Sequence, residues 1–170
     1  QKYKRKKIVQ DRWNPHKKPN LEKYDFIISI PCYNEYEFIF DTLNSIDRQN
    51  KLLLNRTLVS IVINNSDDDK QGISENNHNT YEKILNNNFN FEYVIIDAFS
   101  ELKSMPSKIA GVGLARKISI DSIIDYTKLD TIICFIDADV MLSDTYLQKI
   151  HESKEKNNWS AATTNFSHNI

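Results

Sequence analysis

The sequence predicts an α/β protein with a Rossmann-like, mostly parallel sheet and helices on both faces. Four near-continuous apolar runs, rich in β-branched residues, alternate with segments of helical apolar spacing. The runs lack the two-residue alternation of a strand with one solvated face, which is typical of parallel strands covered on both sides. Strands and helices that alternate in this way form βαβ units, and 170 residues suit one such domain.

The expected strands stand out by their content of Ile, Val, Leu and Phe. They lie at Phe26–Ile30, Leu58–Ile63, Tyr93–Ile96 and Thr131–Ile136, and a fifth is expected at Ser160–Phe166. Right-handed crossovers between parallel strands bring all the carboxyl ends to one edge of the sheet. Ligands of open α/β sheets bind at that edge, so the polar residues that follow each strand are candidate site residues.

The expected helices fill the gaps between the strands. The longer two are Glu35–Asn50 and Lys108–Tyr126, a shorter one is Thr80–Leu85, and a last one starts from Ser143 as its N-cap. The apolar residues of the two longer helices fall on one face of each. These faces comprise Phe38, Ile39, Leu43 and Ile46 in the first helix, and Ile109, Val112, Leu114, Ile118, Ile120, Ile123 and Ile124 in the second.

The charge balance excludes a protein whose overall field attracts nucleic acid, because 22 Lys and Arg oppose 23 Asp and Glu, for a net charge of -1. Basic residues gather locally at Lys2–Lys7, in an N-terminal extension expected over residues 1–24, with the domain itself over 25–170. This cluster suits contact with phosphates or peripheral association with an anionic membrane, and a solvated, frayed terminus is the alternative interpretation.

Two cysteines indicate the compartment. Cys32 and Cys134 lie in strand-like apolar runs rather than at metal-ligand spacing, so we expect buried, reduced thiols in a cytoplasmic protein. No apolar stretch approaches the roughly 18 residues of a membrane span.

Three polar segments follow the expected strands directly. They are Pro31–Glu35 after the first strand, Asn64–Asp69 after the second and Asp137–Asp139 after the fourth. Each alone has an ordinary structural explanation as a turn or a helix cap. Their convergence on one edge of the sheet favours a binding site.

The Asp-Ala-Asp spacing indicates a cation. Residues two apart on an extended chain point the same way, so Asp137 and Asp139 would face one ligand. Two close carboxylates repel each other unless a positive charge lies between them. Hard oxygen ligands suit Mg²⁺ or Mn²⁺, and Mg²⁺ sites commonly combine one or two carboxylates with phosphate oxygens of a substrate.

Four segments, in order, resemble the successive motifs of family 2 glycosyltransferases of the GT-A fold. They are Ile30–Glu35 (IPCYNE), Ile63–Ser66 (INNS), Ala110–Lys117 (AGVGLARK) and Phe135–Asp139 (FIDAD). The resemblance extends from Phe26 to about Ile150 and implies the nucleotide-binding half of that fold. It also implies a nucleoside diphosphate sugar as donor.

The resemblance implies a role for each matching residue. Pro31, Tyr33 and Glu35 would contact the base and ribose, with Asn64 and Asn65 beside them at the end of the second strand. The family usually has an aspartate where this chain has Asn64, whose amide can still pair with a base edge, so the identity of the nucleotide stays open. Arg116 would approach the diphosphate, Asp137 would lie near the ribose or the metal, and Asp139 would bind the metal.

The implied reaction is sugar transfer with inversion at the anomeric carbon, to an acceptor that the sequence does not identify. The family's catalytic base lies well downstream of the Asp-x-Asp motif, so it is expected beyond residue 170, and we expect this chain to bind donor and metal with little or no transfer activity. One alternative is a sugar-nucleotide nucleotidyltransferase, although Pro31–Glu35 has no glycine for the Gly-rich loop of that class. The other is a non-catalytic α/β interaction domain with a solvated acidic edge.

Overall fold

The computed structural model describes residues 12–165, which are built around a four-stranded, all-parallel sheet. The strands are β1 (Tyr24–Cys32), β2 (Thr57–Asn64), β3 (Glu92–Ala98) and β4 (Thr127–Phe135), in the spatial order β3-β2-β1-β4. The predicted parallel α/β sheet is therefore confirmed. The basic cluster Lys2–Lys7 lies outside the described residues.

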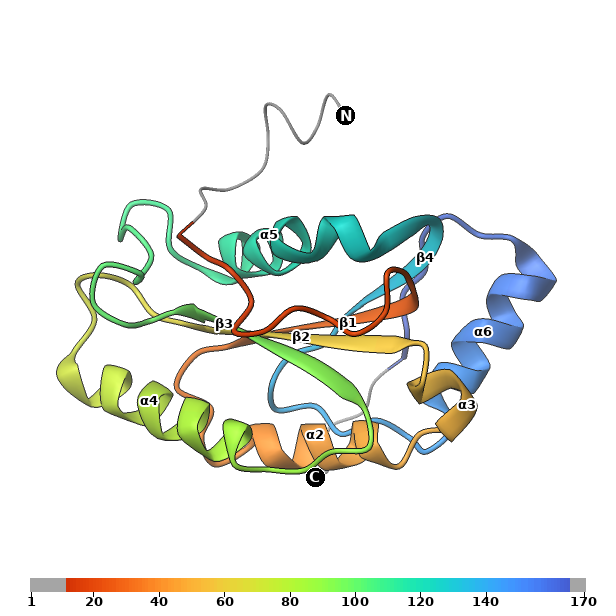
Figure 1. Cartoon of the computed structure of the whole chain (residues 1–170), viewed down its shortest axis with the longest axis horizontal. Coiled ribbons are helices and arrows are strands. Elements are labelled where there is room, and N and C mark those ends of the chain that lie inside the picture. Colours follow the sequence, from red (N-terminus) through yellow and green to blue (C-terminus); the bar gives the residue numbers. More distant parts are fainter. Residues whose placement is uncertain (1–11, 166–170) are drawn as a thin grey trace.

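Helices cover both faces of the sheet, as predicted (Figure 1). Helix α5 and the 3₁₀ turn η1 that extends it lie on one face, and α2 and α4 lie on the other. Helix α6 joins the α2 side, where its Leu147 belongs to the same apolar cluster as residues of α2. The bounds are α2 (Ile39–Asp47), α3 (Lys51–Leu54), α4 (Gln71–Leu85), α5 (Val112–Ile123), η1 (Ile124–Tyr126) and α6 (Tyr146–Asn157).

Alternate residues of the central strands supply the apolar clusters on the two faces of the sheet. In β2, where every residue is buried, Ile61 packs toward α2 and Val62 toward α5. Successive residues of β2 point to opposite faces of the sheet, and helices cover both faces. The sequence of β2 is therefore a continuous apolar run rather than an alternation of apolar and polar residues.

Three helices begin later than the sequence suggests. Glu35 starts a turn, in which its carbonyl accepts hydrogen bonds from the N–H groups of Phe38 and Ile39, so α2 begins only at Ile39 and leaves Phe38 exposed. Helix α5 begins at Val112, and Val112 and Ile109 are exposed rather than in the core. The N-cap of α6 is Thr145, and Ser143 instead accepts a backbone hydrogen bond from Tyr146.

Helix α4 is longer than predicted, because Thr80–Leu85 is only its last part. Its buried face carries Asn77 and Thr80 beside Ile84. Apolar periodicity cannot reveal a helix whose inward face is largely polar.

Strand β4 differs most from the prediction of a strand covered on both faces. It lies at the edge of the sheet, paired only with β1, and Cys134 is its one buried residue. Phe135 and Leu129 are exposed. The expected fifth strand is wrong for residues 160–165, which form no regular element, and Phe166 lies outside the described residues.

Residues 12–23, which belong to the predicted N-terminal extension, run along the edge strand β3. Pro15 forms an antiparallel bridge with Ile96, and the backbone N–H of His16 donates to the carbonyl of Ile95 at 2.8 Å. The imidazole Nδ1 of His16 accepts a hydrogen bond from Ile95 N–H at 2.8 Å. Trp13 is buried and donates through Nε1 to the carbonyl of Lys103. This segment therefore covers the backbone groups that an edge strand would otherwise expose.

Cys32 and Cys134 are free cysteines with buried side chains, as predicted. Within residues 12–165, no helix has the length and apolar character needed to cross a bilayer.

Candidate functional site

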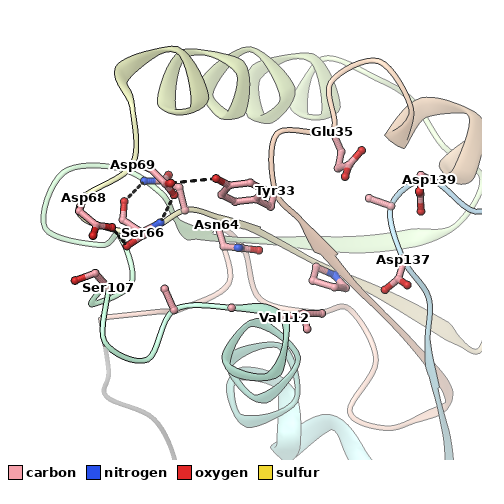
Figure 2. A pocket seen from close by; sticks show the side chains of 15 residues that line it. Tyr33, Glu35, Asn64, Ser66, Asp68, Asp69, Ser107, Val112, Asp137 and Asp139 are labelled. Atoms are coloured by element: carbon pink, nitrogen blue, oxygen red, sulfur yellow. Dashed lines mark hydrogen bonds between the residues drawn. The ribbon is translucent and has the colours of Figure 1, made fainter.

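A pocket of about 650 Å³ opens at the carboxyl ends of β1, β2 and β4, where the sequence places its polar segments (Figure 2). Its volume lies in the range of small-molecule sites. The lining residues are Pro31, Tyr33, Glu35, Asn64, Asn65, Ser66, Asp68, Asp69, Ser107, Ala110, Gly111, Val112, Asp137, Ala138 and Asp139.

The fold brings nearly all of the predicted site residues together in this pocket. Seven of the eight line it, namely Pro31, Tyr33, Glu35, Asn64, Asn65, Asp137 and Asp139. Arg116 is not a lining residue, but its Nη2 donates to Asp137 Oδ1 at 2.7 Å. The four sequence motifs therefore meet at one place although they are far apart along the chain.

The loop after β1 is fixed by a buried side chain of α4. Asn34 adopts a left-handed conformation with φ of 60°, which asparagine tolerates better than most residues. Its N–H donates to Asn77 Oδ1 at 3.0 Å, while Asn77 Nδ2 donates to the carbonyl of Asn64 at 3.0 Å and to Asn65 Oδ1 at 3.3 Å. A single fully buried amide thus connects the loops after β1 and β2.

The loop after β2 forms one end of the pocket. Tyr33 donates to Asp69 Oδ1 at 3.0 Å, and Asp69 Oδ2 accepts from the N–H of Ser66 at 2.6 Å. The Ser66 hydroxyl donates to Asp68. Partial burial and the Asp69 hydrogen bond raise the pKa of Tyr33, so its hydroxyl stays protonated and acts as the donor.

The loop after β4 carries the two aspartates and is anchored to α2. Ala138 is buried while Asp137 and Asp139 are exposed, and both carboxylates line the pocket. Ala138 and Asp139 form a turn rather than the extended backbone on which the predicted spacing depended. The Thr42 hydroxyl donates to the carbonyl of Ala138 at 2.7 Å. One turn further along α2, Ser45 Oγ accepts from the N–H of Leu142 at 3.0 Å.

Gln49, which lies two residues beyond the end of α2, anchors the same loop further along. Its Nε2 donates to the carbonyl of Ser143 at 2.9 Å, and its Oε1 accepts from the N–H of Leu147 at 3.0 Å. Together with Thr42 and Ser45 of α2, this buried side chain satisfies backbone groups of the loop that leads from β4 to α6.

The pocket is strongly acidic. Its lining includes the carboxylates of Glu35, Asp68, Asp69, Asp137 and Asp139 and no basic side chain. Desolvation raises the pKa of Glu35, and the charges of Asp139 and Asp137 raise it further. Figure 2 shows these three carboxylates on one side of the pocket, opposite the Tyr33–Asp69 end.

The side chains present fit a hard divalent cation that arrives with a ligand. Asp139 is exposed and has no ion-pair partner among residues 12–165, and Asp137 keeps one oxygen beyond the Arg116 contact. In that part of the chain, no three His, Cys, Asp or Glu side chains are grouped to hold a metal on their own. Two carboxylates completed by phosphate oxygens are a usual Mg²⁺ arrangement.

The N-terminus of α5 forms another wall of the pocket, through Gly111 and Val112. Gly111 has φ of 146°, a conformation that L side chains rarely adopt, so glycine is required where the chain turns into the helix. The first N–H groups of a helix have no intrahelical acceptor and favour anions.

Several lining residues were not predicted as site residues. Asp68 and Asp69 belong to the polar segment noted after β2, and only the fold shows that they face the pocket. Ser107 comes from the long loop between β3 and α5, which no sequence motif assigns to a site. The N–H of Ser107 donates to Asp67 Oδ1 at 2.9 Å, which ties this loop to the one after β2. Asn77 is missed as well, because an asparagine within a polar helix carries no signal of burial.

No protein-family model and no curated protein sequence matches this chain. Among solved structures, the chain is similar to S. aureus TarS residues 1–349 in complex with UDP-GlcNAc, with 19% sequence identity and a TM-score of 0.53. The alignment covers 79% of this chain and 32% of that one, so this chain spans about a third of the TarS structure. Two further structures of TarS 1–349, one in complex with UDP, align at 20% identity with TM-scores of 0.49. The first likeness shows that this chain shares the fold of part of TarS.

Proposed function

We propose that this chain is the donor-binding part of a glycosyltransferase, which binds a nucleoside diphosphate sugar together with Mg²⁺ or Mn²⁺. The observation that carries the proposal is the pocket at the strand ends, because it unites the residues of all four glycosyltransferase-like motifs. The shared fold with part of TarS, which was solved in complex with UDP-GlcNAc, supports the same conclusion and makes uridine nucleotides the first ligands to test.

The acidity of the pocket argues for a metal. A diphosphate is an anion, and the pocket is lined by five carboxylates without a basic side chain. Two like charges about 4 Å apart repel by about 4 kcal/mol at the effective dielectric of a protein surface. A divalent cation held by Asp137 and Asp139 would offset this repulsion by attracting the phosphate oxygens.

The remaining groups suit the other parts of the donor. Arg116 has an Nε without a hydrogen-bond partner among the described residues, and together with the N-terminus of α5 it provides N–H donors for phosphate oxygens. Pro31 and Tyr33 line the pocket with Asn64 and Asn65, where they would contact the base and ribose. Glu35 lies with Asp137 and Asp139 on the opposite side of the pocket, so a contact of its carboxylate with the ribose stays a prediction.

The proposed chemistry is inverting transfer of the sugar from its diphosphate to a hydroxyl acceptor. A bound metal would stabilise negative charge on the departing diphosphate. The residues of this chain would hold the donor in place, Arg116 beside the phosphates and Asp137 and Asp139 at the metal. The base that takes the acceptor's proton stays predicted beyond residue 170, and the acceptor itself is not assigned.

A thermal-shift titration of UDP with and without Mn²⁺ tests this function. At a ligand concentration of 100 times Kd, binding to the native state adds about 2.7 kcal/mol, which raises Tm by roughly 5–10 °C in a domain of this size. We expect this shift only with Mn²⁺. Asp139→Asn should abolish it, whereas Asp130→Asn, the same change at an exposed residue outside the pocket, should leave it intact.

The outcomes separate the alternatives. A shift with nucleoside triphosphates that clearly exceeds the one with diphosphates would favour a nucleotidyltransferase. The absence of a shift with any nucleotide, with or without metal, would favour an interaction domain and refute the proposal.

A further inference from the structure

A second pocket of about 470 Å³ lies at the amino ends of β2 and β3, whereas the first pocket lies at the carboxyl ends of the strands. Its walls come from the turn after α3, the loop from α4 to β3 and the N-terminal segment along β3 (Figure 1). Because β2 has eight residues at about 3.3 Å each, the two pockets lie roughly 25 Å apart. They share no lining residue, so the second pocket is separate from the proposed donor site.

Five asparagines give the second pocket its chemical character, namely Asn20, Asn55, Asn87, Asn88 and Asn90. All five are exposed or partly exposed, and the amides of the first four make no hydrogen bond with another residue of the described range 12–165. A turn would explain each asparagine alone, but these come from three separate segments that the fold gathers around one cavity. Each free amide offers a ligand both donors and an acceptor.

The fifth asparagine fixes the loop that carries two of these amides. The N–H of Asn90 donates to Asp47 Oδ1 at 2.6 Å, and its Nδ2 donates to Asp47 Oδ2 at 2.7 Å. The Tyr93 hydroxyl donates to the carbonyl of Ile84 at 3.2 Å, which ties β3 to the end of α4. The loop is therefore held at both ends before a ligand binds, which lowers the entropic cost of binding.

The second pocket is electrically balanced, unlike the acidic first pocket. Its charged lining residues are Lys17 and Glu92. Both carboxylate oxygens of Glu92 already accept hydrogen bonds, one from the N–H of Asn20 and one from the Tyr24 hydroxyl. The ammonium group of Lys17 lies 4.6 Å from the centre of the Tyr93 ring. Since neither charge is in excess, the pocket favours a neutral polar ligand over a phosphate or another multiply charged group.

Apolar surface lies beside the free amides. Leu85 is 37% exposed, and Phe89 is partly buried. The Phe89 ring stacks on the buried ring of Phe91, with centroids 4.9 Å apart, and this contact fixes its position. A ligand of the second pocket would therefore meet an apolar wall together with hydrogen-bonding groups, as is usual for small-molecule sites.

We propose that the second pocket binds neutral sugar units of a glycan. A sugar hydroxyl both donates and accepts hydrogen bonds, as an amide does, and the C–H face of a pyranose ring supplies apolar surface for Leu85 and Phe89. The inference goes beyond the proposed donor site and does not depend on it, because it rests on the residues of the second pocket alone. In a glycosyltransferase, this pocket would hold a glycan at a distance from the point of transfer.

Titration of the unmodified chain with neutral trisaccharides, followed by ¹⁵N–¹H NMR, tests the inference. The probes are maltotriose, cellotriose and triacetylchitotriose, with inorganic phosphate as the charged comparison. We expect at least one trisaccharide to shift the backbone and side-chain amide signals of Asn55, Asn87 and Asn88, with a Kd of about 1 mM or below. Phosphate should leave these signals unchanged.

Variants separate sugar binding from folding. Asn55→Ala combined with Asn88→Ala should weaken trisaccharide binding by about tenfold or more, because two hydrogen-bonding amides are lost. Both residues are exposed, so Tm should change by less than about 4 °C. Asn79→Ala, at an exposed residue of α4 outside the pocket, should leave the affinity unchanged. Leu85→Ser removes apolar contact and should weaken binding by about threefold or more.

Each result decides the inference. If no trisaccharide shifts these signals at about 20 mM, or if phosphate shifts them and the sugars do not, the second pocket is not a glycan site. Shifts confined to the first pocket, or unchanged affinities in both the double variant and Leu85→Ser, would also overturn the inference. Binding of UDP with Mn²⁺ decides the proposed function separately, so either claim can fail while the other stands.

Discussion

Replacing Asn77 by alanine tests the connection that holds the two loops of the pocket together. Asn77 is fully buried and makes three hydrogen bonds, from Asn34 N–H and to Asn64 O and Asn65 Oδ1. The net value of a hydrogen bond is about 1 kcal/mol, and each buried partner left unpaired adds to the loss. The expected destabilisation is therefore about 3 kcal/mol, which lowers Tm by roughly 6–12 °C in a domain of this size.

Urea denaturation followed by far-UV circular dichroism measures this change, with Asn79→Ala as the matched control. Asn79 is an exposed asparagine in the same helix, so its substitution should alter the free energy of unfolding by less than about 0.5 kcal/mol. Loss of the connection should also weaken Mn²⁺-dependent UDP binding. If Asn77→Ala is within about 1 kcal/mol of Asn79→Ala, the three hydrogen bonds do not hold the loops and the reasoning is wrong.

Three further predictions follow from other parts of the molecule. Thr42→Val removes the hydrogen bond to the carbonyl of Ala138, so we expect the free energy of unfolding to fall by about 1–2 kcal/mol and Mn²⁺-dependent UDP binding to weaken. Unchanged UDP affinity would mean that α2 does not position Asp137 and Asp139. Burial lowers the pKa of His16, so the unfolded chain binds the proton more readily and stability falls as pH drops through about 6.5. In urea titrations, the difference in free energy of unfolding between the unmodified chain and His16→Gln should become smaller as the pH is lowered from about 7.5 to about 5.5. A difference that does not depend on pH would contradict this expectation. Burial raises the pKa of Cys32 to about 12 and that of Cys134 to about 11. Both thiols should therefore react with a thiol-specific reagent only after the protein unfolds. Rapid reaction in the folded protein would show that the sheet opens at these two residues.

The candidate site was predictable where residues sit directly at strand ends. The rule that parallel strands direct their carboxyl ends to one edge was enough to group Tyr33, Asn64 and Asp137, and the structure places all three in one pocket. The sequence did not indicate Ser107 or Asn77, because one comes from a long loop and the other from the buried face of a helix. Their contributions depend on contacts between segments that no local pattern describes.

The order of the four strands and the four longer helices followed from the sequence alone, because a segment buried on both faces must be apolar and its period differs from that of a helix. The sequence did not indicate the short helix α3, and the fifth strand expected from it does not form over residues 160–165. The exposure of β4 did not follow from the sequence either, because a strand at the edge of a sheet and one at its centre have the same local pattern, and only the pairing decides which is which. The same holds for Asn64. Its residue type was visible in the sequence, but its unsatisfied amide exists only because the fold surrounds it with groups that already bond to one another.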